Sequence, residues 1–169
     1  MKKIVVGCSI AFVLTVGIVI TSFYLVFRTK KRDVSNEAPF EEITKQKITT
    51  KVKTQILKYP TPTVYEDYNY HLEDGTGFGM NSELKIIAEI PVGTSITVEK
   101  VELHTGRVSG TTSAYLFGSV FIVDKQEEYF FQYSWGDYRS LYQDRPYWVF
   151  EKGFWQEEAL EEKYFIEVP

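Results

Sequence analysis

The sequence predicts a mainly β protein, a small barrel or sandwich with an aromatic-rich C-terminal extension, preceded by one transmembrane α-helix. Three observations lead to this prediction. Residues 4–27 form a run of apolar residues without any charge. Beyond residue 40, short segments alternate apolar and polar residues, with the period of two typical of half-buried strands. Aromatic residues make up 16% of the chain, and eight of them fall between Phe131 and Phe150, as in a β-rich core or an aromatic binding face.

The apolar run at residues 4–27 has the length of a membrane-spanning helix. At about 1.5 Å per residue it would extend roughly 36 Å, enough to cross a hydrocarbon core of about 30 Å with some tilt. Phe23, Tyr24 and Phe27 lie near one end, where aromatic rings favour the membrane interface. The sequence therefore predicts a basic tail at residues 1–3, a transmembrane helix at 4–27, and a lipid bilayer as one partner.

Two other interpretations of this run are less consistent with the residues. A cleaved secretory peptide needs a shorter apolar core and a small-residue cleavage site, which Phe27-Arg28-Thr29 does not provide. The stretch Val5-Val6-Gly7-Cys8 resembles a lipobox, but only three apolar residues separate Lys3 from Gly7, and the apolar run continues far beyond Cys8. We therefore expect a signal-anchor that stays attached.

The location expected from this anchor is the bacterial inner (cell) membrane, with a single pass. Four basic residues, Arg28, Lys30, Lys31 and Arg32, follow the run, whereas two lysines and the amino terminus precede it. The positive-inside rule thus favours a cytoplasmic domain by a small margin. A three-residue tail with two lysines instead resembles bacterial signal anchors that keep the N-terminus inside, and on that basis we expect an extracytoplasmic domain.

Charge is divided unevenly along the chain. Of 19 basic residues, six precede Asp33, whereas all 23 acidic residues lie from Asp33 onward, so that this part has 13 basic residues and a formal charge of −10. Such an acidic domain repels phosphate backbones, and we exclude nucleic acid as a partner. The one cysteine, Cys8, lies in the apolar run, so no intramolecular disulfide can form.

The region after the apolar run divides into a basic-to-polar linker at 28–40 and a single β-rich soluble domain at 41–169. A short helical turn is expected at 40–43 and a brief acidic helix at 157–162. Strands are expected from alternation and turn residues at 48–56, 84–90, 95–103, 114–123, 129–135, 146–150 and 163–168. Residues 65–82 have the turn-forming composition of a long loop.

Two of these strands have distinctive patterns. In the strand at 95–103 the alternation shifts phase after Val98, as a β-bulge would cause. The strand at 114–123 is almost wholly apolar, which predicts a central strand that is covered on both faces. Asp124 to Glu128 then form a hairpin tip that leads to the partner strand.

The stretch Ile86-Ile-Ala-Glu-Ile-Pro91-Val-Gly93-Thr94-Ser-Ile-Thr-Val98 resembles a segment of bacterial SH3-like (SH3b-type) domains, whose strands often flank a Pro-x-Gly-Thr-type turn. The resemblance extends over about residues 49–135. It implies a small β-barrel that binds a peptide, a glycan or another protein, and it implies no catalysis. The loop at 65–82 and the aromatic C-terminal extension depart from the family pattern.

No motif predicts catalysis, a metal site or a cofactor. His71 and His104 are far apart in sequence, and neither has the paired spacing of a zinc site, so both are expected to be ordinary surface or loop residues. Ser109, Ser113 and Ser119 lie in no Gly-x-Ser-x-Gly elbow. The glycines at 74–79 lack the flanking strand and helix of a dinucleotide fingerprint and are expected to form a turn.

The region from Tyr133 to Trp148 is the candidate binding site. It combines Trp, Tyr and Arg, the types that dominate binding hot spots, with turn residues. The residues expected to bind are Trp135, Asp137, Tyr138, Arg139, Tyr142, Arg145 and Trp148. The alternative is that the aromatic residues fill the core and that the arginines pair with Asp137 and Asp144.

The sequence thus favours a membrane-anchored, non-catalytic interaction module of a bacterial envelope, with a protein, peptide or glycan partner and no cofactor. Small size and acidic charge also suit an immunity protein that neutralises a toxin. The third hypothesis is a hydrolase, which would require a buried histidine with a shifted pKa in a pocket.

Overall fold

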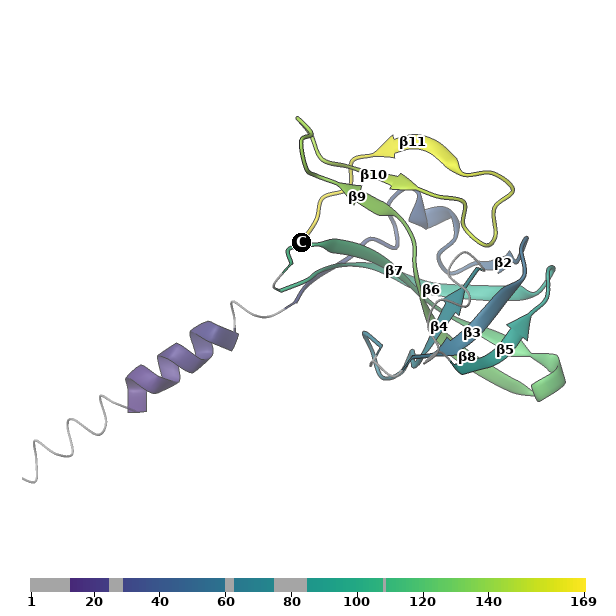
Figure 1. Cartoon of the computed structure of the whole chain (residues 1–169), viewed down its shortest axis with the longest axis horizontal. Coiled ribbons are helices and arrows are strands. Elements are labelled where there is room, and N and C mark those ends of the chain that lie inside the picture. Colours follow the sequence, from purple (N-terminus) through teal and green to yellow (C-terminus); the bar gives the residue numbers. More distant parts are fainter. Residues whose placement is uncertain (1–12, 25–28, 60–62, 75–84, 108) are drawn as a thin grey trace, which may run out of the picture.

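Two long neighbouring strands, β6 (Ser95–Thr105) and β7 (Thr112–Ile122), lie at the centre of the fold. The computed structural model describes residues 13–24, 29–59, 63–74, 85–107 and 109–169. The chain is mainly β, with 47% strand, and its helix at residues 13–24 is short. In Figure 1 the strands form two layers, with the smaller sheet above the larger one.

The larger sheet contains eight strands in the order β1-β6-β7-β8-β4-β3-β5, and β2 pairs with the first part of β6. Its pairings are antiparallel except for the parallel pair β4 and β8. The remaining strands of this sheet are β1 (Lys30–Asp33), β2 (Lys47–Thr49), β3 (Thr54–Lys58), β4 (Tyr70–Glu73), β5 (Lys85–Ile90) and β8 (Glu127–Ser134).

The smaller sheet contains β9 (Asp137–Arg139), β10 (Tyr147–Phe150) and β11 (Leu160–Tyr164), with β10 in the middle. A single buried cluster of apolar side chains joins this sheet to the larger one. Phe40, from the 3₁₀ turn Phe40–Glu42, packs edge-on against Trp135 and Phe150, with ring centroids 5.9 and 5.4 Å away. Trp148 on β10 is 0% exposed. The aromatic residues of the C-terminal region therefore hold the two layers together.

A β-bulge in β6 changes which side chains of that strand face the core. The register with β7 shifts between Val98 and Lys100, which confirms the phase shift read from the sequence. Val98, Val101 and Leu103 face the core, and Lys100, Glu102 and His104 alternate with them on the opposite face. The strand thus supplies both core residues and a polar outer surface.

The transmembrane helix predicted over 4–27 is wrong, and the single-pass topology with it. Within the described residues the helix covers 13–24, and none of the helices there is long and apolar enough to cross a membrane. A helix of 12 residues rises about 18 Å, less than the ~30 Å of a hydrocarbon core. The length of an uncharged run in the sequence does not determine the residues at which a helix begins and ends. The other predicted parts of the span, 4–12 and 25–27, and the tail at 1–3 lie outside the described residues.

Several strands differ from the expected ones. The linker at 28–40 contains β1, which the sequence did not reveal because all four of its residues are charged. The strand expected at 48–56 is interrupted and becomes β2 and β3. The acidic helix expected at 157–162 is wrong, since this segment enters β11. The loop at 65–82 includes β4, and most of the glycine turn at 74–79 lies outside the described residues.

The close packing opposite the bulge gives a test of the fold. A Cβ at Gly118 on β7 would lie 2.3 Å from the backbone oxygen of Thr97 and 3.1 Å from Cζ of Phe131. We expect Gly118→Ala to lower the free energy of unfolding by about 1–3 kcal/mol, because neither strand can move without disturbing the core. Urea denaturation measures this loss. Glu128→Ala, at an exposed position on the neighbouring strand β8, is the control and should change stability by less than about 0.5 kcal/mol.

Candidate functional site

The outer face of the larger sheet carries a set of polar and aromatic side chains in cross-strand rows. One row joins Lys31 of β1, His104 of β6 and Ser113 of β7. The next row joins Glu102 to Tyr115. Directly opposite residues on one face of an antiparallel pair have Cβ atoms about 4.5–5.5 Å apart, so these side chains are neighbours although they are far apart in sequence.

Residues 63–69 cross this outer face, and we call them the strap. Gln132 on β8 accepts a hydrogen bond of 2.8 Å from the Val64 backbone amide. Tyr65 and Tyr68 of the strap pack on Phe117 of β7, with ring centroids 5.1 and 5.0 Å away. The strap therefore covers the outer face of β7, as expected for a central strand that is covered on both sides.

Glu102 joins the strap to the sheet. Its carboxylate accepts hydrogen bonds from the Tyr65 hydroxyl at 2.6 Å, from Lys100 Nζ at 2.9 Å and from His104 Nε2 at 2.8 Å. Burial alone raises the pKa of Glu102, but these bonds outweigh it, so that the pKa is lowered overall. Burial and the bond to Glu102 raise the pKa of Tyr65 to about 12. At neutral pH Glu102 is thus ionised and Tyr65 is protonated.

The Tyr65 ring is held between two lysines. Lys31 Nζ lies 4.0 Å and Lys100 Nζ 4.2 Å from its centroid, both within the range of a cation–π interaction. This arrangement fixes the ring orientation and keeps the Lys31 ammonium beside the strap.

His104 is neutral at neutral pH. It is buried, and desolvation lowers its pKa despite the bond to Glu102. The contact between His104 and Glu102 is therefore a hydrogen bond from a neutral imidazole and not an ion pair. Ser113 lies opposite His104, but among the described residues no hydrogen bond joins the two side chains, so the contact between nucleophile and base that a catalytic triad needs is not formed.

His71 on β4 lies in a second polar cluster. Its ring meets Tyr59 edge-on at 4.2 Å, and its Nδ1 lies 3.4 Å from Gln132 Nε2. The Nε2 atom is buried without a hydrogen-bond partner among the described residues. Burial lowers the pKa of His71 to about 4. Both histidines thus belong to strands and packed clusters, and the expectation that they are ordinary surface or loop residues is wrong.

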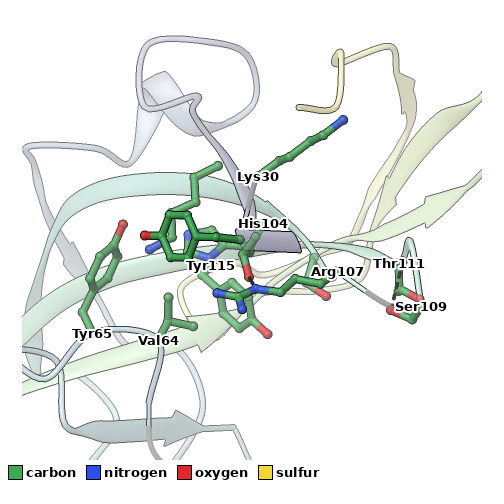
Figure 2. Close-up of a pocket in the computed structure, with 13 residues that line it drawn as sticks. Lys30, Val64, Tyr65, His104, Arg107, Ser109, Thr111 and Tyr115 are labelled. Carbon is green, nitrogen blue, oxygen red and sulfur yellow. Dashed lines mark hydrogen bonds between the residues drawn. The ribbon is translucent and has the colours of Figure 1, made fainter. Parts of the chain in front are cut away.

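An open pocket lies between the strap, β1 and the turn that joins β6 to β7. Its volume is about 1130 Å³. Lys30, Lys31 and Arg107 line it together with the neutral His104, and none of the described lining residues is an Asp or Glu. We call it the cationic pocket. The hydroxyl-bearing residues that line it are Thr29, Tyr65, Ser109, Thr111, Ser113 and Tyr115, together with Tyr24 of the short helix. Figure 2 shows Tyr65 and Val64 at one side of this cationic pocket and Ser109 and Thr111 at the other.

The side chains of the cationic pocket suit an anion. Lysine and arginine donate hydrogen bonds and accept none, and hydroxyl groups can do both. No group of three or more potential metal ligands occurs in the part of the chain that the structure describes. The pocket can therefore bind a hydrophilic anion through charge and hydrogen bonds.

The predicted site residues separate into buried and exposed groups. Trp135 and Trp148 are core residues, 3% and 0% exposed, and Trp135 Nε1 donates to the Glu151 carbonyl oxygen at 2.8 Å. Tyr138 is half-buried, with its ring 5.1 Å from that of Trp148. These three aromatic residues support the smaller sheet, which is the alternative that the sequence left open for them.

The other four predicted residues lie on or beside the hairpin between β9 and β10. Arg139 pairs with Asp137 at 2.6 Å, and the Arg145 guanidinium lies 4.0 Å from the Phe165 ring centroid. Tyr142 is fully exposed at the tip, with a φ of 59°. Asp137 and Arg139 line a second hollow of about 530 Å³, which Tyr142 and Arg145 do not.

The residues of the cationic pocket were not among the predicted site residues. Lys30 and Lys31 were interpreted as charges that flank a membrane helix, and Arg107 lies in a short turn with no motif. The available signal was the pair of lysines before an acidic domain, but only the pairing of β1 with β6 places them beside His104.

Comparisons with protein-family models, with curated proteins and with solved structures find no match for this chain. The resemblance to bacterial SH3-like domains therefore stays a prediction.

The half-buried His71 gives a pH-dependent test. The unfolded chain takes up the His71 proton near pH 6.5, whereas the folded chain does so only at about 4. Its contribution to stability is therefore fully present above pH 6.5 and is lost as the pH falls toward 4. We expect His71→Asn to reduce the loss of unfolding free energy between pH 6.5 and about 5, a window above most carboxylate pKa values. Urea titrations at each pH measure the slope. Glu128→Gln, on an exposed residue, should leave it unchanged, and an unchanged slope in His71→Asn would contradict the assignment.

Proposed function

We propose that this chain is a non-catalytic binding module and that the cationic pocket is its ligand site. The observation that carries the proposal is the convergence of Lys30, Lys31 and Arg107 on one pocket without a lining carboxylate among the described residues. The chain carries a formal charge of −10 from Asp33 onward, so an anion is repelled by most of that surface. A pocket lined by three cations would instead attract an anion and raise its local concentration.

The lining also supports a hydrophilic ligand. Pockets for drug-sized ligands are mostly apolar and measure about 300–1000 Å³. The cationic pocket exceeds that size, and Val64 is its one aliphatic side chain among the described residues. Little apolar area is available to bury, so affinity must come from charge and hydrogen bonds. The hydrolase hypothesis called for a buried histidine with a shifted pKa in a pocket, and His104 has this environment. We favour binding because Glu102 holds the His104 ring and no hydrogen bond among the described residues joins it to a serine. The hydrolase, the immunity protein and the expected envelope location stay predictions.

Citrate and inorganic phosphate are suitable probes of the pocket. We expect the wild-type chain to bind citrate in isothermal titration calorimetry, with an affinity that falls as salt is added. The double variant Lys30→Gln with Arg107→Gln should weaken citrate binding about five- to tenfold, since each exposed pair contributes up to about 1 kcal/mol. Both side chains are exposed, so the thermal unfolding midpoint should not change.

The matched control is the double variant Lys47→Gln with Lys152→Gln, which removes two exposed lysines that do not line the cationic pocket. It changes the net charge equally and should affect citrate binding much less. Absence of citrate and phosphate binding by the wild type, or an equal loss in both double variants, would overturn the proposal.

A further inference from the structure

The cationic pocket adjoins the second hollow, and the two share a wall. Ser109, Thr111 and Ser113 line both of them. The second hollow lies between this wall and the β9–β10 hairpin, where Arg139 and Tyr138 line it. The hollows have volumes of about 1130 and 530 Å³, so together they exceed the space that one compact small molecule fills.

The shared wall presents side-chain hydroxyls. Within the turn the Gly106 amide donates to the Thr111 oxygen at 2.9 Å, and the Gly110 amide donates to the Gly106 oxygen at 3.2 Å. The Thr111 amide donates to Ser109 Oγ at 3.2 Å. A ligand at this wall therefore meets hydroxyl groups, which can both donate and accept.

Half-buried tyrosine rings line both hollows. Tyr115 lines the cationic pocket, and Tyr138 lines the second hollow. Tyr65 also lines the cationic pocket, but the two lysines and Glu102 already engage its ring and its hydroxyl. A tyrosine offers an apolar ring face together with a hydroxyl. Sugar rings match this combination, since they have apolar C–H faces and a rim of hydroxyl groups. Lys30 and Arg107 at one end match carboxylates carried by such a chain. At the other end Arg139 is paired with Asp137, which also lines the second hollow, so a ligand carboxylate there would bind Arg139 in competition with Asp137.

An acidic peptide fits these hollows less well. One way for an extended peptide to bind is to add a strand to a sheet edge, where main-chain hydrogen bonds supply the affinity. Next to the pocket β6 and β7 already pair with each other, with β1 and with β8. The edge strand β1 consists of four charged residues, a composition that discourages strand addition.

We infer that the two adjoining hollows form one site for a linear oligosaccharide that bears carboxylate groups, such as a short chain of uronic acids. This inference rests on the proposed function and extends it, by naming the ligand class and by adding the second hollow. The first sugars occupy the cationic pocket, and the chain then passes the wall of Ser109, Thr111 and Ser113 to reach Arg139.

Chain length and charge are the variables that test this assignment. The probes are the di-, tetra- and hexasaccharide of α-1,4-linked galacturonic acid, with maltohexaose as the neutral chain and hexaglutamate as the acidic peptide. We expect calorimetric affinity to rise at least about tenfold from the disaccharide to the longer chains, because only these reach the second hollow. Maltohexaose and hexaglutamate should each bind at least about tenfold more weakly than the hexasaccharide.

Two arginines on the same hairpin provide the matched variants. Arg139 lines the second hollow, whereas Arg145 lies beside Phe165 and lines neither hollow. Arg139→Gln should weaken the hexasaccharide about three- to tenfold and leave the disaccharide unchanged. Arg145→Gln should change neither. Equal binding of all three chain lengths, or equal binding of hexaglutamate or maltohexaose, would overturn this inference. Citrate binding by the cationic pocket would still support the proposed function in that case.

Discussion

The site depends on the carboxylate of Glu102. It projects from the middle of β6 with a side chain only 13% exposed, and a buried carboxylate is tolerated only when it is paired and hydrogen-bonded. Lys100 and His104 come from the same strand as Glu102, so their hydrogen bonds to its carboxylate join no second segment. Tyr65 comes from the strap, and its hydroxyl is the third donor. The need to satisfy Glu102 therefore ties the strap to the sheet, and the strap in turn forms one wall of the cationic pocket.

The bulge in β6 explains how one strand can provide both a core and a site. Side chains of a strand alternate between faces, and a shift of one residue moves each of them to the opposite face. The bulge between Val98 and Lys100 resets the alternation, so that Ile96 and Val98 before it and Val101 after it are all buried. Beyond the bulge, Lys100, Glu102 and His104 share the outer face. Gly118 lies opposite, where the absent side chain lets β7 approach the backbone of Thr97.

The parts of the fold that could be predicted are those with a local signal. The bulge, the apolar strand β7, the strand β8 and the 3₁₀ turn at Phe40 each have a pattern within a few residues. The strand β1 has none, because its four charged residues form no apolar stripe and pair with residues of β6 about 70 positions away. The aromatic density after Phe131 was a real signal with two possible meanings. Trp135 and Trp148 fill the space between two sheets, and this packing could not be inferred before the second sheet was known.

The same long-range pairing determines which ligands suit the site. Lys30 and Lys31 precede the acidic part of the chain, and strand pairing moves them next to Arg107 on a protein whose remaining charge is strongly negative. Screening in physiological salt limits the attraction of these cations to about 8–10 Å. A short anionic ligand can stay within that range and benefit from all three charges. A long polyanion would extend over acidic surface and be repelled there. Local attraction within a repelling surface therefore favours ligands of limited length, and a few carboxylate-bearing sugar units satisfy this condition.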